Sequence, residues 1–380
     1  MKVLIAIDSF KGSISSLEGS KAIALGIKEV YPAAEIVTLP LADGGEGTVE
    51  ALVRATGGRL VKKEVTGPLQ EKIQAAYGIL GDQKTAVIEV AEACGLPLVP
   101  LEKRNPFYTT TYGVGELILD AMDHGCREFV IGLGGSATND AGVGMLQALG
   151  YRFLDNMQET VGLGAKELSR IVTIDVSQVT PLLKQCYFRV ACDVNNPLYG
   201  PDGASHIFGP QKGATPEMVE ELDLWVKQLA EITLKELNVD IQSIAGAGAA
   251  GGLGAAFSGF LGAHLESGIN LILDMVQMEK HLEGADFVIT GEGKIDGQTS
   301  RGKAPLGAAK LAQNHQIPVI ALAGSVTDET NALHSLGMTS IFSIISSPLS
   351  LEKAMDPKVT FNQLQMTVNQ IFRLIQVLKG

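Results

Sequence analysis

Both ends of this 380-residue chain alternate short apolar runs with segments of helical periodicity, and this pattern constrains the fold most strongly. Near the N-terminus, strands are predicted at Lys2–Ile7 and Ile36–Leu41, with a helix over Leu17–Val30 between them. The last third repeats the pattern, with predicted strands at Phe287–Thr290, Pro318–Ala323 and Ser340–Ile345. Strands separated by helices form parallel βαβ units, and strands that are apolar throughout belong to a sheet covered on both faces.

The middle of the chain follows a different pattern. Three predicted strands at Arg59–Val65, Gln74–Ile79 and Ala86–Val90 are joined by turns at Gly67-Pro68 and Gly81-Asp82. Short connections of this kind predict an antiparallel meander. Further predicted elements are helices at Val114–Asp123, Ala141–Leu149 and Glu217–Leu237, with strands at Phe129–Leu133 and Tyr187–Cys192.

Together the two patterns predict an α/β protein of two domains. Residues 1–60 plus 280–380 are expected to form a discontinuous, doubly wound parallel-sheet domain of the Rossmann or flavodoxin type. Residues 61–279 are expected to form a second α/β domain inserted into the first. The ligand cleft is expected at the junction of the two domains, near the carboxyl ends of the strands.

Charge and composition exclude several classes of protein. The net charge of -12 argues against nucleic acid or an anionic membrane as the main partner. Residues Ile244–Ala263 carry no charge, but seven of these twenty residues are glycine, which disfavours a membrane-spanning helix. The four cysteines form no CxxC pair, so neither a zinc site nor a disulfide framework is indicated, and the cytoplasm is the expected compartment.

The segment Thr290–Pro305 is the strongest functional signal. It holds four glycines, two lysines, an arginine, a glutamate and an aspartate between a predicted strand and a predicted helix, and such loops attract phosphates. Gly291 and Gly293 are expected to present backbone N–H groups. Lys294, Arg301 and Lys303 are expected to neutralise phosphate charge. Glu292 or Asp296 is expected to hold a metal or to accept a proton.

Two further loops follow predicted strands near the N-terminus. In Asp8–Gly12, Asp8 suits a metal or a hydroxyl, and Ser9 and Lys11 are candidate phosphate-binding residues. The same residues could instead be a helix-capping aspartate or serine and a solvent-exposed lysine. In Ala42–Thr48, Asp43 is a candidate Mg²⁺ ligand because hard cations take oxygen ligands, although an acidic helix start has the same composition.

The middle of the chain contributes its own loops. Gly132–Gly142 lacks the spacing of a dinucleotide loop or a Walker A motif, yet Gly134, Gly135 and Ser136 could bring backbone amides to an anion. Asp193 could act as general base or metal ligand, with Asn195 orienting a hydroxyl, or the two could form a turn. Lys212 is a candidate phosphate-binding residue. The glycine-rich stretch Gly246–Gly254 suits either backbone contact with a ligand or tight helix packing.

These motifs resemble those of the type I glycerate kinases of bacteria. The resemblance runs from residue 1 to about residue 375 and rests on six motifs in family order: Asp8–Gly12, Ala42–Thr48, Gly132–Gly142, Asp193–Leu198, Gly209–Gly213 and Thr290–Asp296. It implies ATP-dependent phosphorylation of D-glycerate in glyoxylate and sugar-acid breakdown, with 2-phosphoglycerate favoured over 3-phosphoglycerate. It also implies two α/β domains, one inserted into the other; a homo-oligomer is left open.

The expected cofactors are therefore ATP and Mg²⁺, and the expected partners are the small-molecule substrates D-glycerate and ATP. Asp193 or Asp296 is the candidate base, Lys294 the candidate catalytic cation, and Asp43 or Glu292 the candidate metal ligand. A nicotinamide-dependent hydroxyacid dehydrogenase would need a GxGxxG turn after the first strand, where this chain has Ser9-Phe10-Lys11-Gly12. A small-acid sensor without catalysis would need neither the metal carboxylates nor the lysine-rich loop.

Overall fold

The computed structural model describes residues 1–297, 299 and 303–379. The chain divides into two compact units. Unit 1 comprises Met1–Asp43, Glu50–Ala55 and Ile269–Gly380, and unit 2 comprises Gly44–Val49 and Thr56–Gly268. Both units are α/β, and parallel pairs predominate over the two main sheets taken together, so the predicted fold class is confirmed. That the chain folds as two domains with boundaries near residues 60 and 280 stays a prediction.

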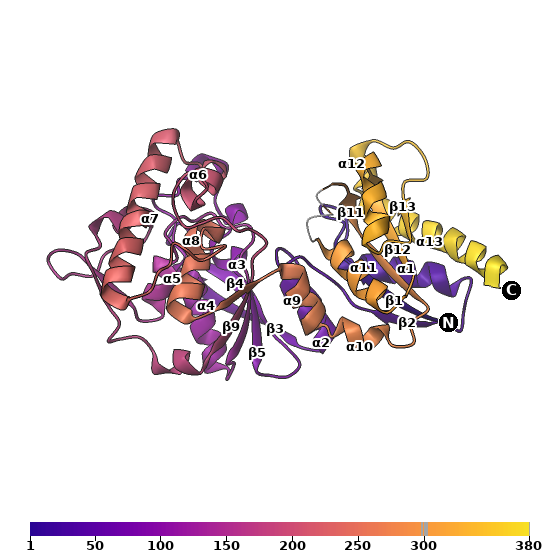
Figure 1. Ribbon diagram of the computed structural model, residues 1–380, viewed down its shortest axis with the longest axis horizontal. Coiled ribbons are helices and arrows are strands. Elements are labelled where there is room, and N and C mark those ends of the chain that lie inside the picture. The colour runs from indigo at the N-terminus through magenta and orange to yellow at the C-terminus, as the bar shows by residue number, and fades with distance from the viewer. Residues whose placement is uncertain (298, 300–302, 380) are drawn as a thin grey trace. The chain divides into compact units, whose positions relative to one another are not determined.

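Unit 1 is built on a five-stranded sheet in which every pair is parallel, in the order β13-β12-β11-β1-β2 (Figure 1). The central strand β11 and its neighbour β1 come from opposite ends of the sequence, with Ile5 in register with Ile289. The strands are β1 (Lys2–Ile7), β2 (Glu35–Thr38), β11 (Phe287–Ile295), β12 (Val319–Val326) and β13 (Ser340–Ser343). The five strands predicted in this part of the chain are thus all present.

Helix α1 (Ser16–Lys28) shows how local sequence fixes an element and tertiary packing positions it. Ser15 and Glu18 form a reciprocal capping box that satisfies backbone N–H groups at the helix start. Its buried face packs against the C-terminal helix α13 (Pro357–Lys379), where Gln365 and Asn369 donate hydrogen bonds to Glu29 at 2.6 and 2.7 Å. The two ends of the chain are therefore joined both in the sheet and between these helices.

Strand β11 corrects one expectation. The glycine-rich loop was predicted to begin at Thr290, but the strand continues to Ile295, with Gly291 opposite Leu322 and Lys294 opposite Ser325 of β12. Beyond Thr290 the residues alternate small or apolar with charged, and this period of two allows the strand to continue past the carboxyl end of β1. Gly291 and Gly293 thus lie in a strand rather than in a loop.

Unit 2 contains a six-stranded mixed sheet in the order β10-β9-β6-β5-β4-β3. The predicted meander is confirmed, since β3 pairs with β4 and β4 with β5 in antiparallel fashion, while the remaining pairs are parallel. Its strands are β3 (Arg59–Thr66), β4 (Lys72–Ile79), β5 (Thr85–Glu89), β6 (Glu128–Gly132), β9 (Tyr187–Ala191) and β10 (His264–Glu266). Helix α4 (Tyr112–Asp123) contributes Val114 and Leu117 to the core under this sheet.

The remaining elements are shorter, apart from α7, which ends in a left-handed Asn238. The other helices are α2 (Thr48–Thr56), α3 (Ala91–Cys94), α5 (Val143–Ala148), α6 (Ala204–Phe208), α7 (Pro216–Leu237), α8 (Ala249–Ala255), α9 (Gly268–Met275), α10 (Met278–Leu282), α11 (Ala304–Asn314) and α12 (Leu351–Ala354). No helix in the described part of the chain is long and apolar enough to cross a membrane.

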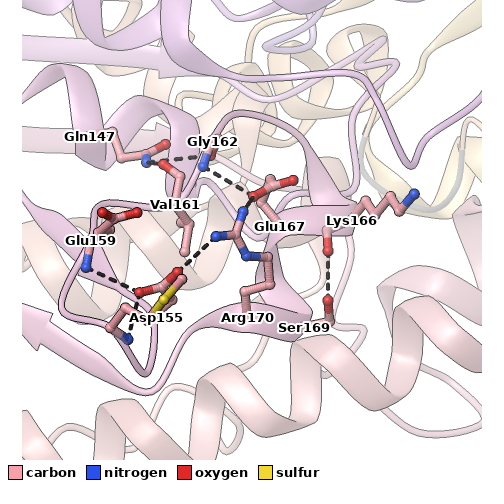
Figure 2. A network of polar contacts seen from close by, with 10 residues as sticks. Gln147, Asp155, Glu159, Val161, Gly162, Lys166, Glu167, Ser169 and Arg170 are labelled. Atoms are coloured by element: carbon pink, nitrogen blue, oxygen red, sulfur yellow. Dashed lines mark hydrogen bonds and ion pairs between the residues drawn. The ribbon is translucent and has the colours of Figure 1, made fainter.

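The long loop between the small strands β7 (Arg152–Leu154) and β8 (Thr173–Asp175) is held by ion pairs (Figure 2). Arg170 lies between two carboxylates, 2.7 Å from Asp155 and 2.9 Å from Glu167. The buried Asp155 also accepts backbone N–H bonds from Met157 and Glu159. This network ties the short 3-10 helix Ala165–Arg170, which contains Glu167 and Arg170, to the turn at Asp155.

The glycine-rich stretch Gly246–Gly254 serves tight packing. At Gly251, with a φ of +72°, an added Cβ would lie 2.0 Å from the carbonyl oxygen of Thr138, and at Gly248 it would lie 2.3 Å from that of Pro197. The backbone therefore approaches its neighbours more closely than any side chain would allow. This contact orders the loop that follows β6.

Candidate active site

In unit 1, the carboxyl ends of β1 and β11 bring two predicted motifs together. Asp8 directly follows β1, and its backbone N–H donates to the carbonyl oxygen of Gly291 at 2.9 Å. Neighbouring parallel strands end at the same edge of a sheet, which places Asp8 close to Glu292. Both carboxylates are largely buried, with exposed fractions of 4% and 6%.

The carboxyl group of Asp8 has a raised pKa. Burial and the negative charge of Asp43 raise the pKa of Asp8 to about 7, although the backbone N–H of Ser9 and the charge of Lys11 oppose the shift. Lys11 forms an ion pair with Asp43 at 3.1 Å. Burial opposes the charged form of Lys11, but the surrounding carboxylates outweigh it and raise the pKa of the lysine.

The residues after Gly291 form two further ion pairs. Glu292 accepts hydrogen bonds from Thr299 at 2.8 Å and from Lys303 at 3.2 Å. Burial nevertheless raises the pKa of Glu292. Lys294 and Asp296 pair with each other at 3.0 Å. Cations and carboxylates thus alternate along the strand end.

These residues surround a cavity of about 360 Å³. Of the residues predicted here, Ser9, Lys11, Glu292, Gly293, Lys294 and Lys303 line it. Asp43 is joined to the cluster by its ion pair with Lys11, and Asp296 is joined to it by its ion pair with Lys294. Gly291 lies one step back in the strand, and Arg301 lies outside the described residues.

The predicted metal ligands do not belong to a ready-made cage. Among the described residues, no three His, Cys, Asp or Glu side chains are grouped so that they could hold a metal ion. Mg²⁺ commonly takes only one or two carboxylates and completes its shell with phosphate oxygens and water. Carboxylates such as Asp43 and Glu292 suit that kind of site, and a metal role for either residue stays a prediction.

Unit 2 has a second polar cavity at the carboxyl ends of its own parallel strands. It measures about 240 Å³ and lies between the loop after β6 and the loop after β9. The predicted residues Gly134, Gly135, Ser136, Asp193 and Lys212 all line it. Asn195 is exposed on the loop after β9, beyond the described lining residues.

Lys212 is the central cation of this second cavity. It is 2% exposed, and its ammonium group donates to the carbonyl oxygen of Thr138 at 2.6 Å and to the hydroxyl of Ser136 at 3.2 Å. Burial lowers the pKa of Lys212 to about 8, even though Cys94 and Asp140 favour its charged form. A desolvated cation beside glycine amides is well suited to a small anion.

The flanking residues fix the loops around Lys212. Asp140 is buried and accepts hydrogen bonds from the backbone N–H and the hydroxyl of Thr111 at 2.8 and 2.9 Å. It also accepts the N–H groups of Gly142 and Gly144 at the start of α5. Asp193 accepts the N–H of Gly268 at 3.0 Å.

Sequence reasoning missed the apolar part of the unit 1 cavity. Phe10, Ile344, Ile345, Leu351 and Met355 line it together with the charged residues. An isolated Ile or Leu after a strand gives no functional signal, because such residues are ordinarily assigned to the core. Their spatial coincidence with the lysines was the missing information.

Comparison with known proteins agrees with these features. The family model for the glycerate kinase family matches residues 3–376. The chain is 50% identical to the glycerate 2-kinase of Escherichia coli K12, over 93% of each chain, and 48% identical to the glycerate kinase of Bacillus subtilis 168, over 100% of this chain and 99% of that one.

Among solved structures, a crystal structure described as that of a glycerate kinase 2 from Salmonella typhimurium LT2 superposes with a TM-score of 0.92. It is 46% identical in sequence and covers 100% of this chain and 99% of its own. With a family match over nearly all residues and relatives near half identity, the chain belongs to the glycerate kinase family.

Proposed function

We propose that this protein transfers the γ-phosphoryl group of Mg²⁺·ATP to D-glycerate and forms phosphoglycerate. Membership of the glycerate kinase family over residues 3–376 is the observation that carries this proposal. The chemistry of the two cavities supports it. A kinase must hold two anionic substrates, and each unit has a cavity lined by lysine and glycine at the carboxyl ends of parallel strands.

The balance of charge in unit 1 supports a role for Mg²⁺. The lysines of the cluster are Lys11, Lys294 and Lys303, and its carboxylates are those of Asp8, Asp43, Glu292 and Asp296. Carboxylates at this density would repel a triphosphate unless a cation intervened. Asp43 or Glu292 would hold Mg²⁺, and the ion would neutralise charge on the phosphates.

The residues of the chain would supply positioning and proton transfer. Lys294 and Lys303 would neutralise charge that develops on the transferred group. Asp193 or Asp296 would accept the proton of the attacking glycerate hydroxyl. Asp193 is exposed at a cavity and Asp296 is paired with Lys294, so each is a candidate on different grounds.

We favour 2-phosphoglycerate as the product, within the breakdown of glyoxylate and sugar acids. One relative, 50% identical over 93% of the chain, bears the name glycerate 2-kinase, and that name supports the 2-isomer.

A phosphoryl-transfer assay with D-glycerate, ATP and MgCl₂ tests the activity, and proton-coupled ³¹P NMR identifies the product. Phosphorus of 2-phosphoglycerate couples to a single methine proton and gives a doublet, whereas that of 3-phosphoglycerate couples to two methylene protons and gives a triplet. Omission of glycerate and omission of MgCl₂ are the controls. Failure to form either phosphoglycerate would refute the proposal, and a triplet would refute only the choice of isomer.

A further inference from the structure

The cavity of unit 1 has two chemically different parts. One part carries the charged side chains at the ends of β1 and β11, including Lys11, Lys294 and Lys303. The other part is apolar and is formed by Phe10, Ile344, Ile345, Leu351 and Met355. A ligand that fills the whole cavity must therefore combine anionic groups with an apolar part.

Two apolar side chains in this cavity are more exposed than their chemistry favours. Leu351 is 76% exposed and Met355 is 38% exposed, although the neighbouring Ile344 is 1% exposed. Large apolar side chains grouped beside a polar site in this way indicate a surface that a ligand covers. The exposed fractions of Leu351 and Met355 thus point to an occupant.

The apolar wall is firmly attached to the polar loop after β1. The hydroxyl groups of Ser13 and Thr360 lie 2.6 Å apart, and Thr360 also donates to the carbonyl oxygen of Ala354 at 3.0 Å. The Met355 methyl group lies close to Gly12 in this loop. A Cβ added at Gly12 would lie only 2.5 Å from that methyl group. Helix α12 and the loop after β1 are therefore positioned as one piece.

The cavity of unit 2 differs from that of unit 1 in its size and in its cations. It is smaller, at about 240 Å³ against 360 Å³, and it is centred on the buried Lys212. Glycerate is a small polar acid with no ring, so a compact cavity with one desolvated cation suits its carboxylate. A nucleotide needs both an apolar surface and several cations, which the unit 1 cavity offers.

We propose that the unit 1 cavity binds the adenine nucleotide, with the base against Ile345, Leu351 and Met355. The triphosphate then extends toward Lys11, Lys294 and Lys303. This assignment rests on the proposed kinase function, and it specifies which unit takes the nucleotide and which residues recognise its base.

The test replaces the exposed apolar side chain at the cavity and a matched one elsewhere in the same unit. Leu351→Glu introduces a charge where the base would lie, and Leu378→Glu makes the same change on α13 at an identical exposed fraction of 76%. Because Leu351 is exposed, its substitution is expected to leave the fold intact. A milder double variant, Leu351→Ala with Met355→Ala, guards against local disruption of α12.

Isothermal titration with the non-hydrolysable ATP analogue AMP-PNP in the presence of MgCl₂ measures nucleotide binding without turnover. We expect Leu351→Glu to raise the Kd for AMP-PNP about tenfold or more, and the double alanine variant to raise it less. Titration with tripolyphosphate, which has no base, should give about the wild-type Kd in both variants. Leu378→Glu should bind both probes as the wild type does.

The outcomes separate this inference from the function on which it rests. Unchanged AMP-PNP binding in both cavity variants, with phosphoglycerate still formed, would overturn the base site and leave the kinase function standing. Equal weakening of AMP-PNP and tripolyphosphate would also overturn it, because the wall would then not act on the base. Absence of phosphoglycerate formation by the wild type would refute the function, while the AMP-PNP titration would still decide whether Leu351 contacts a nucleotide.

Discussion

At the scale of single residues, Lys212 shows how this protein keeps a charge out of water. Two hydrogen bonds, to the carbonyl oxygen of Thr138 and to the hydroxyl of Ser136, replace part of its hydration. Burial still lowers the pKa of Lys212 to about 8. A buried lysine lowers the stability of the folded protein. In the proposed function this lysine binds an anionic substrate, which accounts for its presence.

The stability cost of Lys212 can be measured through its pH dependence. The pKa of Lys212 in the folded protein lies below the ordinary lysine value of 10.5, so between about pH 8 and pH 10 the unfolded chain binds more protons than the folded one. The free energy of unfolding of the wild type should therefore rise with pH in this range relative to Lys212→Met, with a slope approaching about 1.4 kcal/mol per pH unit.

Urea denaturation of both proteins at several pH values measures this difference. Cys94, whose pKa burial raises to about 12, is present in both proteins, so its own contribution largely cancels. At pH 7 the methionine variant should be at least as stable as the wild type, because it buries no charge. A constant difference in unfolding free energy from pH 7 to pH 10 would show that Lys212 does not titrate as proposed.

The proposed catalytic groups give a second prediction at this scale. Asp193→Asn keeps an oxygen that can accept the N–H of Gly268, and Lys294 is 59% exposed, so neither Asp193→Asn nor Lys294→Met should disturb folding. Each substitution removes a charge needed for transfer and should lower kcat about 10²–10³-fold.

Steady-state assays with Asp202→Asn and Lys310→Met as controls check these variants, since both control side chains are exposed and lie outside the two cavities. The controls should retain near wild-type kcat. Full turnover by Asp193→Asn would leave Asp296 as the candidate base, and full turnover by Lys294→Met would remove that lysine from the proposed mechanism.

At the scale of elements, the packing of α1 on α13 depends on a glycine at their contact. Gly26 lies within α1, and a Cβ added there would meet the carbonyl oxygen of Gln365 at 2.4 Å. Alanine is ordinarily the better helix residue by about 1 kcal/mol, so intrinsic propensity and packing make opposite predictions here.

We expect packing to decide, because the obstructing atom belongs to the backbone of α13 and cannot rotate away. Gly26→Ala should lower the free energy of unfolding by about 1–3 kcal/mol, measured as a lower urea midpoint. Lys21→Ala, on the exposed face of the same helix, should change it by less than about 0.5 kcal/mol. A Gly26→Ala protein more stable than the wild type would show that α1 and α13 separate readily.

At the scale of the whole molecule, each unit has a core of its own. Among the described residues, the buried apolar cluster of unit 2 extends from Val65 to Phe257 and includes none from unit 1. The cluster under the unit 1 sheet combines residues from Val3 to Ala34 with residues from Ile289 to Phe372. Separate cores indicate that the units could fold separately.

This division predicts the behaviour of a fragment. Residues 44–268 contain all of unit 2 and should fold alone, with a cooperative thermal transition by circular dichroism and a dispersed NMR spectrum. A fragment of residues 269–380 lacks β1 and α1 and should not fold, because β1 lies between β11 and β2 in the sheet. A broad, non-cooperative transition of the first fragment would argue against unit 2 as a domain.

Much of this architecture can be predicted from sequence because it depends on local chemistry. The apolar runs that became β1, β5 and β12 were recognisable by their length and spacing, and the helical periodicity of Leu17–Val30 located α1 to within a few residues. The motifs after β1, β6 and β9 were recognisable because parallel strands expose their carboxyl ends to ligands. Where the predicted loop at Thr290 instead continued as strand, the pairing of Gly291 with Leu322 decided the outcome.

The sequence by itself therefore determined the α/β class, the family motifs and the loops that carry charge, since these follow from neighbours along the chain. Only the tertiary structure decided which distant residues meet. It brought Asp8 beside Glu292, buried Lys212 against Thr138, and set Leu351 and Met355 at the cavity that the lysines line. Charge coupling, desolvation and shape complementarity act through space, so no periodicity in the sequence could reveal them.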